Sequence, residues 1–242
     1  ILIALGSLLI LIPLYISISI ALKNPQELAE SALSFPLNFH WENFAKAIEV
    51  TNFFTAFKNS AMITIFTLVF TLLSNSLVAY GVARNMHRKL FRNLYYYFVS
   101  ALFIPFPIIM LPIVKQTSAL GLNNPVGLIL LYVVYGMAMN IFIYVGYIRS
   151  IPVELEEAAI VDGCSTWGVF WRVIFPLLTP INATVGILTC LWAWNDFLLP
   201  LVILSDSADA TLPLVQYVFQ TEFGVDYNLA FASYLMAMAP MV

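Results

Sequence analysis

Charged residues are scarce in this sequence: Asp, Glu, Lys and Arg make up 10% of its 242 residues, against about 25% in soluble domains. Apolar residues make up 62%, where soluble domains contain about 45–50%. A soluble protein of this size could not hide so much apolar surface from water. The composition therefore argues against a soluble globule and against a disordered chain, and it predicts a protein embedded in lipid.

Cysteine, histidine and excess positive charge are also scarce. The two cysteines, Cys164 and Cys190, are too few for a disulfide framework, and we expect both to be free thiols. The two histidines, His40 and His87, lie far apart and have no metal-ligand spacing. The net charge of −3 offers no basic surface to nucleic acid. We expect neither a metal site nor a nucleic-acid partner.

Apolar segments near the length that crosses a bilayer, about 20 residues, recur along the chain and predict an all-α membrane protein with six spans. The third contains Pro105, Pro107 and Pro112 and is expected to be kinked or broken. Both ends of the chain lie in apolar sequence, which indicates truncated termini; a helix that enters only half of the membrane is the alternative at the C-terminus. The predicted spans cover residues 1–22, 59–83, 94–114, 126–148, 182–204 and, incompletely, 229–242.

Basic residues set the predicted orientation, because Lys and Arg concentrate in short cytoplasmic loops. The loop 84–92 contains four basic residues and no acidic one. We therefore place it in the cytoplasm, together with the N-terminus and the segment 149–181. The segment 205–228, which is acidic and aromatic, then lies outside.

The segment 149–181 is predicted to form two short helices joined by a turn. Pro152 suits a first helical position, and Gly163 suits a left-handed helix end. Ser165 or Thr166 can cap a second helix, 167–175, which Pro176 would end. Such a compact helical projection suits the docking of a soluble partner that drives the membrane protein. An interfacial connector without a partner is the alternative.

This segment resembles the EAA loop of ABC importer permeases. The pattern is Glu157-Ala158-Ala159, then Gly163, then Val173-x-Phe175-Pro176, with apolar Val173 and Phe175 where the family prefers Ile and Leu. The rest of the chain resembles the second permease of maltose-type systems. The further matching motifs are Lys23-x-x-x-Glu27, Trp41-x-Asn43-Phe44, Asn59-Ser60 and Trp194-Asn195-Asp196-Phe197-x-x-Pro200.

The resemblance implies half of a type I ABC importer pathway for a carbohydrate, in a bacterial or archaeal cytoplasmic membrane. It implies a second permease, two ATP-binding subunits and an extracytoplasmic solute-binding protein as partners. ATP and Mg would be bound by the ATPase subunits, with no cofactor and no catalysis in this chain. The residues that it places at the ATPase contact are Glu157, Ala158, Ala159, Asp162, Gly163 and Pro176.

The residues themselves agree with a chain that binds no nucleotide. Gly163 and Gly168 have the gap of a phosphate-binding loop, but Val169-Phe170 stands where Lys-Ser/Thr is required. An ion-coupled secondary carrier is the alternative function, and it would need buried ionisable residues near the middle of the membrane. Only Asp196 approaches that position. An intramembrane enzyme would need a catalytic pair within the bilayer, and none is visible.

Polar residues within the predicted spans are candidates for the substrate path, because they are expensive in lipid and usually face an interior or a watery cavity. Asn and Asp could bind sugar hydroxyls, and Trp192 or Trp194 could stack on a sugar ring. Packing between helices is the alternative role. The candidates are Asn75, Asn140, Trp194, Asn195 and Asp196.

The external segment 205–228 is predicted to be structured around Pro213-x-x-Gln216-Tyr217. By resemblance it meets the solute-binding protein, with Gln216, Tyr217 and Phe219 as candidate contacts. A plain solvated loop is the alternative.

Overall fold

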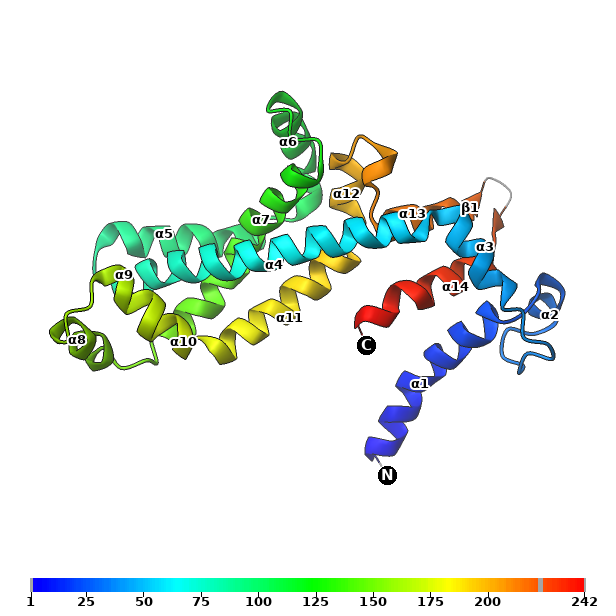
Figure 1. The fold of residues 1–242 in the computed structure, drawn as a ribbon, viewed down its shortest axis with the longest axis horizontal. Helices are drawn as coiled ribbons and strands as arrows, with labels where there is room; N and C mark the ends of the chain where they lie inside the picture. Colours follow the sequence, from blue (N-terminus) through cyan, green and yellow to red (C-terminus); the bar gives the residue numbers. More distant parts are fainter. Residues whose placement is uncertain (1, 222–223, 242) are drawn as a thin grey trace. The chain divides into compact units, whose positions relative to one another are not determined.

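The computed structural model describes residues 2–221 and 224–241, so Glu222 and Phe223 of the external segment lie outside the described residues. The described chain is mainly helical (Figure 1). Its contacts divide it into two compact units: Ile1–Ser60 with Ser207–Val242, and Ala61–Asp206. The helix α4 runs through the boundary between them.

The first unit joins the beginning and the end of the chain. The core of this unit lies where α1, α3 and α14 meet, around Ala21, Ala47, Phe219 and Ala230. The strands β1 and β2 pair antiparallel, with Gln220 opposite Val225. Its elements are α1 (Leu2–Ala21), α2 (Pro25–Glu30), α3 (Glu42–Thr51), the start of α4 (Phe53–Arg84), η3 (Ser207–Asp209), α13 (Leu212–Val215), η4 (Gln216–Phe219), β1 (Gln220–Thr221), β2 (Gly224–Val225), α14 (Tyr227–Met238) and η5 (Ala239–Met241).

Two asparagine side chains bind the carbonyl groups at the end of α1. Asn43 Nδ2 donates to the carbonyls of Ala21 (2.9 Å) and Lys23 (2.8 Å). Asn228 Nδ2 donates to the carbonyls of Ile20 (2.9 Å) and Lys23 (2.8 Å). The last carbonyls of a helix have no partner within the helix. Asn43 and Asn228 supply partners from α3 and α14, and so fix all three helices at one point.

Asn59 and Ser60, which open the predicted second span, hold the segment after residue 206 within the same unit. Asn59 Nδ2 donates to the carbonyls of Ala208 (2.8 Å) and Ala210 (3.1 Å). Ser60 Oγ accepts from the backbone N–H of Leu212 at 2.8 Å. The predicted external segment is therefore folded into short helical turns and a two-stranded ribbon, as expected from its proline and aromatic residues.

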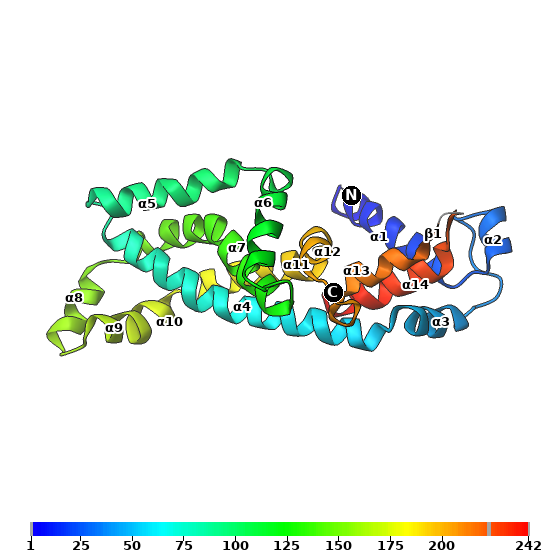
Figure 2. The same ribbon diagram turned by 90° about the horizontal axis from the view of Figure 1, so that it is seen from above.

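The second unit is built around α7. Figure 2 shows α5 and α7 beside the later part of α4, and the buried side chains of α4, α7 and α11 form continuous apolar clusters. Its elements are the rest of α4, α5 (Lys89–Ser100), η1 (Ala101–Phe103), α6 (Phe106–Ala119), α7 (Pro125–Ile148), α8 (Glu154–Val161), α9 (Thr166–Val169), the π-helical turn η2 (Phe170–Ile174), α10 (Phe175–Leu177), α11 (Thr179–Asn195) and α12 (Leu198–Ile203).

A row of buried polar side chains lies along α4: Thr64, Thr67, Thr71 and Asn75. Their spacing of three, four and four residues places them on one face of the helix, and none is more than 5% exposed. Within the described part of the chain, neither the three hydroxyl groups nor Asn75 Nδ2 has a hydrogen-bond partner. This face of α4 therefore packs by shape rather than by hydrogen bonds.

The helix bounds agree with some predicted spans and differ from others. Within the described residues, α4 and α7 are long and apolar enough to cross a membrane. The segment predicted as 94–114 is broken, as its prolines led us to expect: α5–η1 and α6 meet at 108°. A second bent pair consists of α9–α10 and α11, which meet at 74°. By length and composition, each of the two bent pairs can count as one broken span.

The segment predicted as a span over 182–204 is not one continuous helix. The helix α11 begins at Thr179 and ends at Asn195, and α12 follows at Leu198–Ile203. Asp196 adopts an extended conformation (φ −73°, ψ 130°), and its side chain is held by a tyrosine from α7, as described below. Asp196 therefore connects the end of α11 to α7.

Candidate functional site

The segment between α7 and α11 forms a helical hairpin, which comprises α8, a tight turn, and the run α9–η2–α10. The turn has the hydrogen bonds of a Schellman motif. The N–H of Cys164 donates to the carbonyl of Ala159 (2.9 Å), and that of Gly163 to the carbonyl of Ile160 (3.0 Å). Gly163 has φ +87°, a value that favours glycine over residues with a Cβ atom. The predicted role of Gly163 as a left-handed helix end is therefore confirmed.

The second arm of the hairpin starts as predicted and continues further than predicted. Ser165 caps α9 by accepting from the N–H of Gly168 at 3.2 Å. The prediction that Pro176 ends this arm was wrong, because the helical run continues to Leu177. The wider π turn at Phe170–Ile174 precedes the proline and opens the helix where the ring would otherwise clash with the carbonyl four residues earlier.

The prediction that Pro152 occupies the first helical position of α8 was also wrong. The helix α8 begins at Glu154, and Pro152 lies in the turn before it. Its three glutamates still occupy the first turn, where the helix dipole favours negative charge. Because no side chain caps this end, the start of α8 must be fixed by other contacts.

The hairpin has two different faces. Ala159 is buried against the core of the second unit, whereas Glu157, Ala158, Asp162, Gly163 and Pro176 are exposed. Large apolar side chains of the hairpin are also exposed to solvent: Leu155, Ile160, Val161 and Trp167 are 44%, 57%, 87% and 62% exposed. An exposed apolar patch beside exposed acidic residues is typical of a surface that binds another protein.

Glu156 has a role that the sequence did not reveal. The residue as a whole is 8% exposed, and its carboxylate accepts hydrogen bonds from Tyr80 and Arg84, near the end of α4. Tyr80 and Arg84 are four residues apart and so share a face of α4. That spacing was the available signal, but nothing in the sequence showed which of the three glutamates it would meet.

The polar candidates for a substrate path have different environments. Asn75 lies in the buried row on α4, and Asn140 is buried in α7. Trp194 is 5% exposed. Asn195 is exposed, and its Nδ2 donates back to the carbonyl of Leu191 at 2.7 Å.

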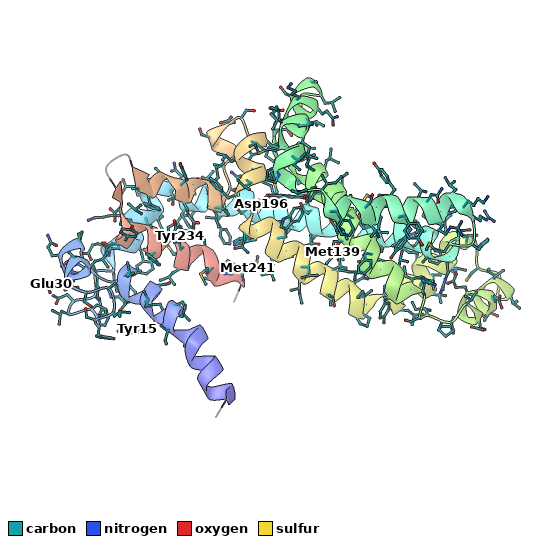
Figure 3. All side chains as sticks on the ribbon, turned by 180° about the vertical axis from the view of Figure 1, so that it is seen from behind. Tyr15, Glu30, Met139, Asp196, Tyr234 and Met241 are labelled. Atoms are coloured by element: carbon teal, nitrogen blue, oxygen red, sulfur yellow. The ribbon has the colours of Figure 1, made fainter. Side chains whose placement is uncertain are left out.

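Asp196 links α11, α12 and α7 (Figure 3). Its Oδ2 accepts from the Tyr132 hydroxyl at 2.9 Å, and its Oδ1 accepts from the N–H of Leu198 at 3.1 Å. Trp192 packs edge-on against Tyr132 (4.9 Å between ring centroids) and stacks on Tyr135 (5.7 Å). Trp192 and Tyr135 remain 37% and 38% exposed, so they present an aromatic surface beside the carboxylate.

The candidate contacts in the external segment have different environments. Phe219 is buried in the core of the first unit, and Gln216 Nε2 donates weakly to the Ser233 carbonyl at 3.4 Å. Tyr217 is 56% exposed. Only Tyr217 therefore presents most of its side chain to a partner. Within the described ranges, no three His, Cys, Asp or Glu side chains are grouped as metal ligands.

Comparison with known proteins decides what kind of protein carries this hairpin. Residues 75–242 match the family described as "Binding-protein-dependent transport system inner membrane component". The chain belongs to this family of transport permeases. Its members are non-catalytic transmembrane subunits of ABC transporters, so the permease is a membrane-embedded component rather than an enzyme. Membership also favours the importer hypothesis over the ion-coupled carrier.

Individual relatives match the permease over nearly its whole length. It is 39% identical over 241 residues to the multiple sugar-binding transport system permease protein MsmG of Streptococcus mutans, covering 98% of this chain and 87% of MsmG. It is 34% identical to AmyC of Thermoanaerobacterium thermosulfurigenes, a probable starch degradation products transport system permease, over 98% of this chain and 86% of AmyC.

A solved structure shares the fold of the permease. It is a chain from a bacterial ABC transporter involved in the import of the acidic polysaccharide alginate. The TM-score is 0.85 at 21% identity, over 99% of this chain and 89% of that chain. At this level of identity, the likeness concerns the fold alone.

Proposed function

We propose that the permease forms half of the transmembrane pathway of an ATP-driven importer for a sugar or oligosaccharide. The substrate class rests on the relatives, whose names specify sugars and starch degradation products. The observation that carries the mechanism is the α8–α10 hairpin, which exposes Glu157 and Ala158 beside a Gly163 turn. The partners are a second permease, two ATPase subunits and an extracytoplasmic solute-binding protein.

The exposed face of the hairpin docks into the ATPase subunit. The small side chain of Ala158 permits close approach of another backbone, and Glu157 offers a charge to a basic partner group. The exposed Val161 and Trp167 supply apolar area, which drives association more than surface charge does. Because both arms of the hairpin are helical, movement of the ATPase passes into the membrane helices instead of being absorbed by a loose loop.

In the membrane, the permease forms six spans, one of which is the broken helix made by α5–η1 and α6. Broken helices are tolerated where neighbouring helices or watery cavities satisfy the freed backbone groups. Arg88 directly before α5 and Lys89 and Arg92 in its first turns are exposed. Their positive charge supports a cytoplasmic position for the connection after α4 and for the hairpin. The segment around Tyr217 lies outside, where it meets the solute-binding protein.

The substrate path passes the region around Asp196. The exposed rings of Trp192 and Tyr135 suit stacking on a sugar ring, and Asn195 offers amide groups to hydroxyls. The hydrogen bond from Tyr132 holds the Asp196 carboxylate in place. Asn75, Asn140 and Trp194 are buried, and they contribute to helix packing rather than to sugar contacts.

Replacement of Ala158 by Trp tests the docking surface. The bulky ring should prevent close approach of the ATPase subunit, so the ATPase subunits should no longer copurify and ATP-dependent sugar uptake in proteoliposomes should be lost. Ala29→Trp, an exposed alanine of α2 at the opposite predicted side, is the matched control and should retain both. Unchanged copurification and uptake in Ala158→Trp would rule out docking at this face.

Cysteine labelling tests the orientation. In a background with Cys164 and Cys190 replaced by Ser, Ser165→Cys and Tyr217→Cys introduce one exposed thiol each. An impermeant maleimide added to intact cells should label Tyr217→Cys and should reach Ser165→Cys only after the membrane is opened. The reverse pattern would overturn the proposed orientation.

A further inference from the structure

Both carboxylate oxygens of Glu156 are bound by side chains of α4. The Tyr80 hydroxyl donates to Oε2 at 2.6 Å, and Arg84 Nε donates to Oε1 at 2.5 Å. The two donors come from one helical face, and the acceptor comes from α8, more than seventy residues later in the chain. The contact therefore joins two elements that have no direct covalent connection.

Arg84 and Tyr80 also hold the parts of the hairpin on either side of Glu156. Arg84 Nη2 donates to the carbonyl of Ile151, in the turn that leads into α8, at 3.0 Å. The Tyr80 ring packs against Phe170 of the π turn, with 5.3 Å between centroids. The end of α4 thus contacts the entry turn, α8 and the second arm of the hairpin together.

The contact is shielded from water. The side chains of Arg84 and Glu156 are 16% and 10% exposed, whereas Arg88, four residues further on, is exposed. A shielded pair of this kind is sensitive to loss of one partner, since the other charge is then left without compensation. The planar guanidinium fixes direction as well as distance, which an ammonium group would not do.

We infer that Glu156 is a positioning residue that makes α4 and the hairpin move as one body. This inference rests on the proposed function: force that reaches the exposed face of α8 at Glu157 passes through Glu156, on its buried face, to Arg84 and Tyr80. Glu157, proposed to contact the ATPase, and Glu156, which contacts α4, are adjacent in α8; Glu157 is exposed and Glu156 is buried. Removal of the Glu156 contact uncouples the hairpin from α4 without removing the docking surface.

A distance measurement tests whether the two elements are rigidly joined. Spin labels are placed at His87, three residues after α4, and at Arg172 in the π turn, in a background without native cysteines. Both positions are exposed, and neither belongs to the docking surface. The reconstituted transporter should show one narrow label distance that is the same with and without trapped ATP. Glu156→Gln should broaden the distribution, and a wild-type distance that changes with ATP would overturn the inference.

A functional measurement tests the consequence. Glu156→Gln and Arg84→Gln should each keep the ATPase subunits bound but lower sugar uptake per ATP hydrolysed about tenfold, within the range of about 5–150-fold that is typical of coupling between sites. The double variant should lose less than the sum of the two single losses, because both single variants remove the contact between Glu156 and Arg84. Arg88→Gln is the matched control and should keep the wild-type ratio.

The outcomes separate this inference from the proposed function. Additive losses in the double variant, or a wild-type ratio in Glu156→Gln, would overturn the role of Glu156. Loss of ATPase copurification in Glu156→Gln, with an unaltered thermal unfolding temperature, would also overturn it by placing Glu156 in the docking contact. Failure of Ala158→Trp to disturb docking would instead overturn the proposed function, and the label distances would remain valid for the membrane-embedded chain.

Discussion

Replacing Asn43 and Asn228 together by Ala should destabilise the permease by about 2–6 kcal/mol, because two buried carbonyls would lose their partners at about 1–3 kcal/mol each. The carbonyl of Ala21 is bound by Asn43, and that of Lys23 by both asparagines. Such a loss is a large fraction of the stability of a typical domain, about 5–15 kcal/mol. The thermal unfolding temperature in detergent, followed by tryptophan fluorescence, measures the effect.

Because both asparagines bind the Lys23 carbonyl, the single and double variants are expected to differ in a specific way. Each single variant leaves that carbonyl with one bond, and only the double variant leaves it with none. The double loss should therefore exceed the sum of the single losses. Asn38→Ala, in the exposed part of the same connection, is the control and should be close to wild type. Strict additivity in the double variant would contradict the proposed arrangement at the end of α1.

Replacing Gly127 by Ala should destabilise the permease by about 3 kcal/mol or more, at the upper end of the cost of overpacking. Gly127 lies in the first turn of α7, where a Cβ atom would stand 1.9 Å from the carbonyl oxygen of Leu122. That oxygen belongs to the backbone of the turn between α6 and α7, so it cannot rotate away as a side chain would. The α6–α7 turn would have to open.

Gly146 of the same helix is the matched control. A Cβ atom at Gly146 meets nothing within 4 Å, and alanine favours a helix over glycine by up to about 1 kcal/mol. Gly146→Ala should therefore raise the unfolding temperature while Gly127→Ala lowers it. Equal shifts in the two variants would show that helix propensity, rather than the contact with Leu122, decides the result.

Local features of the hairpin could be predicted from the sequence because a few neighbouring residues determine them. Gly163 takes a left-handed conformation and Ser165 caps a helix for reasons that lie within four residues of each. The break near Pro105 is local in the same sense, since proline lacks a donor and disfavours a helical conformation in the residue before it. These features were present in the sequence and were confirmed.

Features that depend on distant contacts could not be predicted. Asp196, which follows the end of α11, accepts a hydrogen bond from Tyr132 of α7, 64 residues away in the chain. Phe219 was interpreted as an exposed contact, but it packs into the core formed by α1, α3 and α14. Glu156, rather than Glu154 or Glu157, is the glutamate that binds Arg84. The sequence could not show this, because α8 is too short for its apolar pattern to identify the buried face.

The unbonded hydroxyl groups of Thr64, Thr67 and Thr71 have an evolutionary consequence. Valine has nearly the same shape as threonine, and at these positions it would bury a methyl group in place of a hydroxyl that has no hydrogen-bond partner among the described residues. Selection for stability alone should therefore replace these threonines with valine over time. If relatives retain these threonines, selection must act on a property other than stability. One such property is a helix surface that can slide past its neighbours as the transporter cycles.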